Sequence, residues 1–214
     1  MAERVATITA LAGTNGAGKS SIIGAFIRAR GGAYYNPDEA ARILRECHPH
    51  LKQEEANIQA WNLGREGLEA AIAGRSDYVF ETTLGGTTIP MLLGRAARKG
   101  IRVTIWYIGL NSAEEHIRRV GDRVQRGGHD IPEHSIRERF VRSRENLVSL
   151  MPHLYELKLF DNSASVDMAA GERPLPRTLL HLRNGHVIKH AALSSMPQWA
   201  RPLIAAARGS FGLD

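Results

Sequence analysis

The chain alternates between short apolar runs and longer stretches in which apolar residues recur every three or four positions. The short runs have the length and composition of buried strands and cover residues 5–12, 33–35, 77–83, 102–110 and 158–163. The spacing between them predicts helices over residues 20–32, 37–47, 52–74, 90–99, 112–126 and 132–151. Alternating strands and helices predict a parallel sheet with right-handed crossovers and ligands at the carboxyl ends of the strands.

The last fifty residues have a different pattern. Asn184-Gly185 lies between two apolar runs, which predicts an antiparallel β-hairpin at 178–190. A closing helix is expected near 197–208, and residues 169–177 have the prolines and charges of an exposed loop.

Length and composition indicate a single globular domain over residues 1–214. Within it we expect a core over 1–168, an arginine-rich lid over 118–146, and a C-terminal hairpin and helix over 178–208. The hydrophobic content of 43% and the charged content of 23% are those of a soluble protein.

The sequence favours a cytoplasmic protein. No apolar stretch is long enough to span a bilayer, and the charged Glu3 and Arg4 directly before the first strand argue against a signal peptide. The single cysteine, Cys47, excludes an intrachain disulfide.

The net charge of +6 raises the question of nucleic-acid binding. The arginines concentrate between residues 118 and 144, where Phe140 is the only aromatic residue available to stack a base. A phosphate-handling enzyme with arginines around its nucleotide therefore explains the charge better, although a nucleic-acid substrate stays open.

The first strand runs directly into the pattern Gly13-x-x-x-x-Gly18-Lys19-Ser20, a Walker A phosphate loop followed by a helix. The glycines let successive backbone N–H groups point at phosphate oxygens, and the helix N-terminus adds its positive dipole end. Lys19 is expected to reach the β and γ phosphates of ATP, and Ser20 to hold Mg²⁺. The loop residues predicted to bind ATP are Gly13, Thr14, Asn15, Gly16, Ala17, Gly18, Lys19, Ser20 and Ser21.

Acidic residues lie near the carboxyl ends of two of the predicted strands. Asp38 is placed to accept the proton of a substrate hydroxyl that attacks the γ-phosphate, but an acidic residue after the helix cap Asn36 also simply favours the helix dipole. Glu81 and Thr83 end the third strand, where Glu81 could bind substrate hydroxyls or a magnesium-bound water and Thr83 could bind the substrate. The threonines could equally be ordinary strand residues.

Arginines flank a Gly127-Gly128 hinge that could fold two helix faces over a nucleotide. They would neutralise charge on the transferring phosphoryl group, or they could form a solvated surface paired with nearby glutamates. The candidates for phosphate contact are Arg123, Arg126, Arg139 and Arg142.

The segments LAGTNGAGKSS, NPDEAAR, FETTL and GGHDIPE followed by IRERFVRS resemble the zeta toxin family of phosphate-loop kinases, in particular its short stand-alone bacterial branch. The resemblance covers about residues 5–165. It implies a three-layer αβα sandwich around a parallel five-stranded sheet of order 2-3-1-4-5. It also implies an antitoxin as a possible partner and ATP-dependent phosphorylation of the 3′-hydroxyl of UDP-N-acetylglucosamine, a sugar nucleotide.

The resemblance also assigns roles to residues of this chain. Asp38 matches the family's catalytic base, and Lys19 and Ser20 match its phosphate-loop pair. Glu81 and Thr83 match its substrate-binding Glu-x-Thr. For the two phosphate-contacting arginines, Arg126 and Arg139 have suitable separation, while Arg123 and Arg142 compete for the same roles.

Two further classes of function stay open. A nucleic-acid end kinase or repair factor is supported only by the basic charge. An NTP-hydrolysing regulatory ATPase is less favoured, because the guanine-reading Asn-Lys-x-Asp motif and an ABC-type Leu-Ser-Gly-Gly-Gln signature are absent from the sequence.

Overall fold

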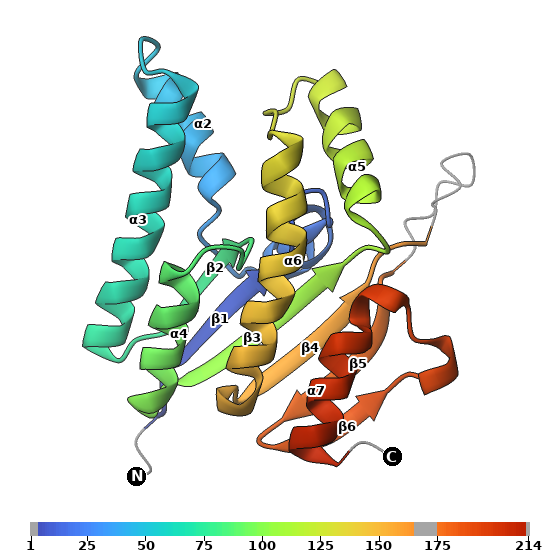
Figure 1. Cartoon of the computed structure of the whole chain (residues 1–214). Coiled ribbons are helices and arrows are strands. Elements are labelled where there is room, and N and C mark those ends of the chain that lie inside the picture. The colour runs from blue at the N-terminus through green and yellow to red at the C-terminus, as the bar shows by residue number, and fades with distance from the viewer. Residues whose placement is uncertain (1–3, 165–174, 213–214) are drawn as a thin grey trace.

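The computed structural model describes residues 4–164 and 175–212, so most of the loop expected at 169–177 lies outside the described residues. One six-stranded sheet runs through the molecule in the order β2-β1-β3-β4-β5-β6 (Figure 1). The first four of these are parallel, and β5 and β6 add to the β4 edge in antiparallel orientation. The strands are β1 (Thr7–Ala12), β2 (Tyr78–Thr82), β3 (Arg102–Gly109), β4 (Glu156–Asp161), β5 (Arg177–Arg183) and β6 (His186–His190).

The strand expected at 33–35 is reduced to a single parallel bridge between Tyr35 and Phe80. Tyr35 donates its N–H to Val79 O and accepts a hydrogen bond from Glu81 N, each at 2.8 Å. The extended segment stops there because Asn36 caps the next helix, accepting from Asp38 N at 2.9 Å. With this bridge counted in place of a strand, the parallel part of the sheet has the expected order, and the predicted α/β fold class is confirmed.

The helices agree with the predicted pattern except for the places where three of them begin. The first helix begins as a π-helical turn, η1, before the short α1; α4 begins at Thr88; and α7 begins at Arg201, after a 3₁₀ turn. The α-helices are α1 (Ala25–Ala29), α2 (Pro37–Cys47), α3 (Gln53–Gly74), α4 (Thr88–Arg98), α5 (Ala113–Gln125), α6 (Glu133–Leu150) and α7 (Arg201–Phe211). The π-helical turn is η1 (Lys19–Gly24), and the described 3₁₀ turns are η2 (Met151–His153), η4 (Leu193–Ser195) and η5 (Gln198–Ala200).

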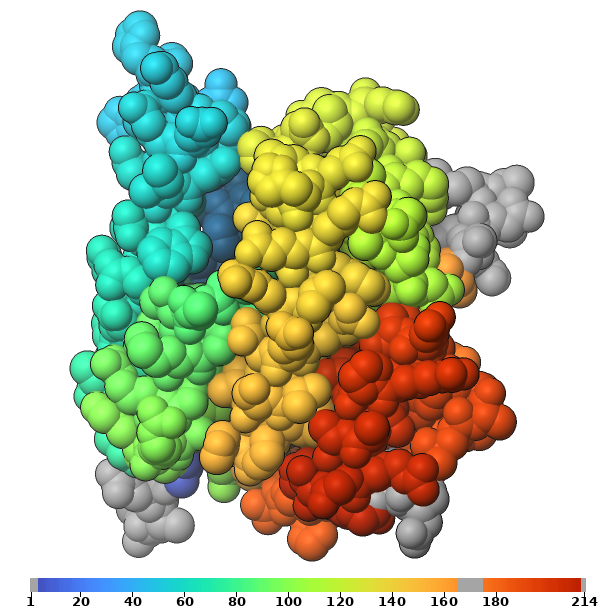
Figure 2. All heavy atoms as spheres, viewed as in Figure 1, coloured from blue at the N-terminus to red at the C-terminus, as the bar shows by residue number. Residues whose placement is uncertain are grey.

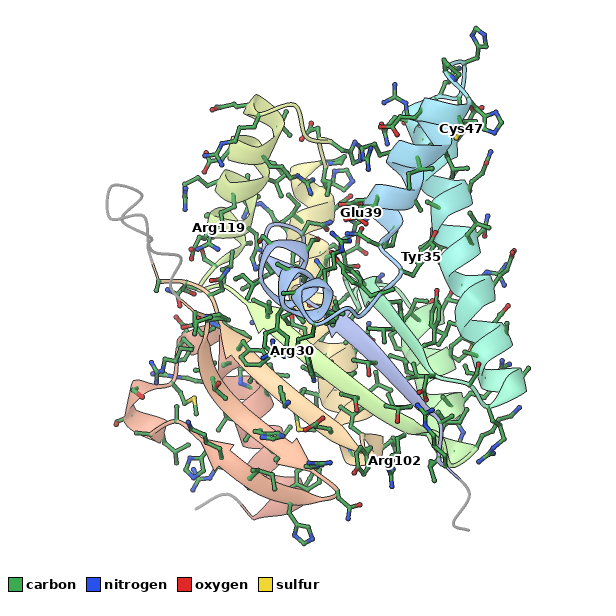
Figure 3. All side chains as sticks on the ribbon, turned by 180° about the vertical axis from the view of Figure 1, so that it is seen from behind. Arg30, Tyr35, Glu39, Cys47, Arg102 and Arg119 are labelled. Atoms are coloured by element: carbon green, nitrogen blue, oxygen red, sulfur yellow. The ribbon has the colours of Figure 1, made fainter. Side chains whose placement is uncertain are left out.

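The main core lies between the sheet and the helices in front of it in Figure 1, α3, α4, α6 and α7. Ile105 and Leu159 from the strands and Leu147 from α6 are fully buried there. On the other face, η1 and α1 lie over the sheet, as Figure 3 shows from behind, and bury Leu11 and Ile108. Of the helices in the described ranges, none is long and apolar enough to cross a membrane.

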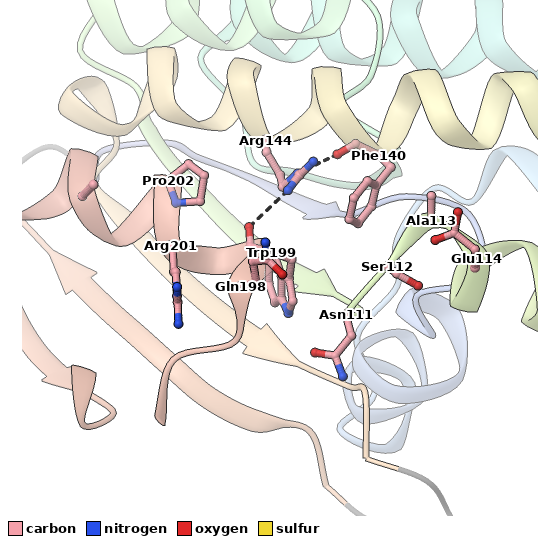
Figure 4. A pocket seen from close by; sticks show the side chains of 11 residues that line it. Asn111, Ser112, Ala113, Glu114, Phe140, Arg144, Gln198, Trp199, Arg201 and Pro202 are labelled. Carbon is pink, nitrogen blue, oxygen red and sulfur yellow. Dashed lines mark hydrogen bonds between the residues drawn. The ribbon is translucent and has the colours of Figure 1, made fainter. Parts of the chain in front are cut away.

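The predicted hairpin forms, with Asn184 and Gly185 at φ 51° and 74° in its turn. The segment after it docks on the core through Trp199, which stacks on Tyr107 with 6.2 Å between ring centroids. Arg144 of α6 donates to the carbonyl oxygens of Phe140 at 2.7 Å and Trp199 at 3.3 Å, at a hollow between α5, α6 and α7 (Figure 4). These contacts tie the C-terminal segment to α6, the helix that carries the candidates Arg139 and Arg142.

Candidate active site

The phosphate loop has a backbone that requires glycine. Gly13 has φ 137°, and a Cβ atom there would lie 2.2 Å from the carbonyl oxygen of Ile108 on the neighbouring strand β3. Gly18 has φ 96°, and a Cβ atom there would lie 2.7 Å from Asn162 Nδ2. Residues with side chains are strained at such φ values and would collide here, so the glycines of the motif are fixed by geometry.

Polar side chains from three elements hold the loop from outside. His116 of α5 donates through Nδ1 to the carbonyl oxygen of Asn15 at 2.7 Å, and Asn162, after β4, donates to Ala17 O at 2.8 Å. Ser143 of α6 lies 3.5 Å from Thr14 Oγ1. The sequence interpretation missed His116, Asn162 and Ser143, because no motif marks residues that support a loop from distant elements.

His116 is 1% exposed, and burial lowers its pKa to about 4, with the nearby positive charge of Lys19 acting in the same direction. The folded state therefore binds fewer protons than the unfolded state between about pH 6.5 and pH 4. Stability should fall by up to about 3 kcal/mol as the pH drops through this window. Urea unfolding at pH 7.5, 5.5 and 4.5 measures this, and His116→Gln should remove that part of the slope. Parallel pH dependences of the two proteins would contradict the buried neutral imidazole.

Lys19 and Ser20 meet one carboxylate at the floor of the loop. Lys19 is 6% exposed and donates through Nζ to Gly13 O at 2.8 Å, and it lies 3.6 Å from Glu81 Oε1. Ser20 Oγ donates to Glu81 Oε2 at 2.7 Å, and Asn36 Nδ2 approaches the same oxygen at 3.5 Å. Glu81 is 9% exposed, so these contacts compensate for burying its charge.

The oxygen atoms of Ser20 and Glu81 are hard ligands of the kind that Mg²⁺ prefers. Within residues 4–164 and 175–212 no group of three or more His, Cys, Asp or Glu side chains could hold a metal ion. Ser20 and Glu81 would supply protein oxygens to such an ion, and nucleotide phosphates and water would supply the others, as is usual for magnesium in kinases.

Asp38 lies in the first turn of α2, with its side chain 54% exposed. Its carboxylate faces α5, where Arg123 Nη1 lies 3.4 Å from Asp38 Oδ2. Arg123 also donates through Nη2 to His129 O at 2.7 Å, so it links the connection between α5 and α6, residues 126–132, to Asp38. We call this connection the lid loop. The carboxylate is thus free of the helix cap, which Asn36 forms, and it is accessible to a hydroxyl.

The four candidate arginines have different positions. Arg139 Nη1 donates to Asn15 Oδ1 of the phosphate loop at 2.9 Å, and burial lowers the pKa of Arg139 against the opposing effect of Asp38. Arg142 is exposed and pairs with Glu138 at 2.9 Å. Arg126 is exposed at the C-terminal cap of α5 and does not line the cleft described below. Arg139 and Arg123 are therefore the two arginines that contact other candidate residues.

A cleft of about 850 Å³ is lined by residues of the phosphate loop together with Asp38 and Glu81. Figure 2 shows it as a hollow between α2 and α3 on one side and α6 on the other. Thr83 also lines it, and Thr83 Oγ1 accepts a hydrogen bond from Gly85 N at 3.4 Å. The candidate residues brought to this cleft are Asn15, Lys19, Asp38, Glu81, Thr83, Arg139 and Arg142.

Three known proteins illustrate what this chain is similar to, one in sequence and two in structure. An uncharacterised protein of Haemophilus influenzae is 30% identical over 128 residues, which is 60% of this chain and 88% of that protein. A chain of the AvrRxo1-ORF1:-ORF2 crystal structure with ATP superposes with a TM-score of 0.63 at 17% identity, covering 98% of this chain and 65% of that chain. A putative kinase from Chloroflexus aurantiacus superposes with a TM-score of 0.51 at 13% identity, covering 78% of this chain and 95% of that one.

The two structures share the fold with this chain, which spans 65% of the AvrRxo1 chain's length. The zeta toxin family model matches residues 4–166 and includes the phosphate loop, Asp38, Glu81 and the arginines of α5 and α6. That match extends over most of the chain and agrees with the motifs and with the sheet order. The chain therefore belongs to the zeta toxin family of phosphate-loop kinases.

Proposed function

We propose that the protein is an ATP-dependent phosphotransferase that acts on a hydroxyl group. The observation that carries this is the placement of Asp38 and Lys19 along one cleft, with Arg139 beside the phosphate loop. The acceptor hydroxyl oxygen attacks the γ-phosphorus, the bond from that phosphorus to the β–γ bridging oxygen breaks, and ADP leaves. Asp38 accepts the hydroxyl proton.

ATP binding is supported by the glycine geometry of the loop and by the ATP in the AvrRxo1-ORF1:-ORF2 structure. Lys19 would turn from Gly13 O toward the β and γ phosphates, and Arg139 would leave Asn15 for the γ-phosphoryl oxygens. Bound Mg²⁺ would neutralise phosphate charge, with Ser20 as a ligand and Glu81 holding either the ion or one of its waters.

For the acceptor we propose the 3′-hydroxyl of UDP-N-acetylglucosamine, which membership of the zeta toxin family favours. The contacts of Glu81 with Ser20 and Lys19 favour a role on the metal side of the cleft. Thr83 and the residues beyond it are then left to contact the acceptor.

The AvrRxo1 chain was crystallised together with a second protein, ORF2. We extend this to the present chain as a proposal that it too is held by a protein partner of the antitoxin class. Co-purification of the tagged protein with the product of a neighbouring reading frame, and loss of transfer in that complex, would support it.

The kinase proposal is tested by incubating the protein with labelled ATP and a panel of sugar nucleotides, nucleosides and oligonucleotides. Label on UDP-N-acetylglucosamine supports the whole proposal, and label on another small molecule supports the reaction but not the substrate. Label on an oligonucleotide end would make the protein a nucleic-acid kinase, and release of phosphate without a labelled acceptor would make it an ATPase.

Among the arginines, Arg139→Ala should lower turnover by up to about 10³-fold, because Arg139 already lies on the phosphate loop. Arg123→Ala should have a smaller effect, since Arg123 acts through Asp38 and the lid loop. Steady-state kinetics of both variants measure this, with Arg126→Ala as the matched control from an exposed site outside the cleft. A loss in the Arg126 variant equal to that in the Arg139 variant would contradict these positions.

A further inference from the structure

The side of the sheet opposite the main core has no helix over β5 and β6 among the described residues. η1 and α1 lie over the carboxyl ends of β1 and β3, where they bury Leu11 and Ile108. Figure 3 views this side, and the side chains of β5 and β6 stand there without a covering helix. Residues paired across neighbouring strands point to the same side of a sheet, so the strand register shows what this side presents.

Two rows of paired residues cross this side from β3 to β6. The first row consists of Trp106, Lys158, His181 and Lys189. The second row, on the same side because it lies two residues further along β3 and β4, consists of Thr104, Glu156, Arg183 and His186. We call these two rows, together with Phe26 of α1 and Arg30 at the end of α1, the rear face.

The rear face carries more positive than negative charge. Its basic side chains are those of Arg30, Lys158, Arg183 and Lys189. Glu156 is the single acidic residue in the two rows, and its Oε1 lies 2.7 Å from His181 Nε2 and 3.8 Å from Lys158 Nζ. The other three basic residues form no ion pair with any part of the chain that the structure describes. The charge therefore favours a partner with several negative charges.

Aromatic rings lie between these cations. The Arg30 guanidinium is 3.6 Å from the centre of the Phe26 ring, and Lys158 Nζ is 4.8 Å from the centre of the Trp106 ring. The two rings are neighbours, with 6.3 Å between their centroids. Phe26 is 47% exposed, so its ring and the guanidinium plane on it are open to a flat group. A charged surface that only faces water has no use for such rings.

We propose that the rear face binds single-stranded nucleic acid, with phosphates at Arg183 and Lys189 and a base stacked at Phe26 and Arg30. A nucleic-acid strand has negative charges at regular intervals with flat bases between them, and an acidic peptide has only the charges. This function is separate from phosphoryl transfer, because no residue of the rear face lines the catalytic cleft.

The phosphate contacts are tested by fluorescence anisotropy of labelled oligo(U) and oligo(dT) of about 12 nucleotides, a typical site size for single-strand binding. The wild type should bind at least one of them, and the tighter of the two identifies RNA or DNA as the ligand. Arg183→Ala combined with Lys189→Ala should weaken binding about 10-fold and reduce the slope of log K against log salt concentration by about 1.4. The control is Arg42→Ala combined with Arg95→Ala, which removes the same charge from exposed positions on α2 and α4 and should change neither quantity.

The stacking contact is tested with Phe26→Ala, which should lower the affinity by roughly 5-fold to 100-fold without changing the salt slope. Phe26→Tyr keeps the ring and should restore most of the affinity. Met91→Ala is the matched control, because Met91 is 63% exposed on α4, on the other side of the sheet. Urea unfolding of each variant shows that the protein is folded.

Unlabelled poly-L-glutamate separates nucleic acid from an acidic protein as the partner, and it should compete weakly. Competition as strong as that of unlabelled oligo(U) would overturn the proposal in favour of an acidic protein. Absence of binding by the wild type, equal losses in the two double variants, or a Phe26→Ala variant that binds like the wild type would also overturn it. The Arg183 and Lys189 double variant should transfer phosphate like the wild type, so the rear face and the kinase can fail independently.

Discussion

Lys19→Ala is expected to lower the rate of phosphoryl transfer by about 10³–10⁵-fold. This is the range for losing a positively charged side chain that stabilises the transferring phosphoryl group. Lys19 is buried at the floor of the loop, and the other basic side chains that line the cleft among the described residues are Arg65, Arg139 and Arg142. Arg139 approaches from α6, on the side of Asn15, and cannot take the position of Nζ against Gly13 O.

The Lys19 variant should still fold. Glu81 loses its ion pair but keeps hydrogen bonds from Ser20 and Asn36, so we expect a loss of about 1–3 kcal/mol, less than the usual stability of a domain. Labelled-ATP transfer and urea unfolding measure the two effects, and Lys99→Ala at the exposed end of α4 is the control. A folded Lys19 variant with near-normal transfer would show that the loop does not bind the transferred phosphate.

Asp38→Asn should lower turnover by about 10²–10⁴-fold with little change in ATP affinity, because the amide keeps the shape of the carboxylate but cannot take a proton. The structure separates this role from helix capping, since Asn36 accepts the hydrogen bond from Asp38 N. Loss of the exposed pair with Arg123 should cost no more than about 1 kcal/mol. Product formation by mass spectrometry and the melting temperature give both quantities.

Glu39→Gln is the matched control for Asp38. Glu39 is the next residue in the same first turn of α2, and its carboxylate is bonded to Arg28 at 2.6 Å, away from the cleft. Both variants should lose similar, small amounts of stability from the helix dipole. Only the Asp38 variant should lose transfer, so equal activity in the two would reduce Asp38 to a residue that stabilises the helix.

The sequence by itself determined most of the helices and strands and the position of the phosphate loop. Local signals act over a few residues, which is why the Walker A pattern, the Asn36 cap and the Asn184-Gly185 turn all appear where they were expected. Periodicity also predicted the long helices α3 and α6 to within one or two residues. The family motifs assigned residues to roles, and those roles remain predictions for experiment.

Only the tertiary structure decided which side chains meet. Helical spacing placed Arg123 and Arg126 on one face of α5, but the packing of α5 beside α2 brings Arg123 to Asp38 and leaves Arg126 exposed. Parallel pairing of β2 beside β1 brings Glu81 to Ser20, 61 residues away. Such contacts depend on the relative rotation and position of whole elements, which local sequence patterns do not encode.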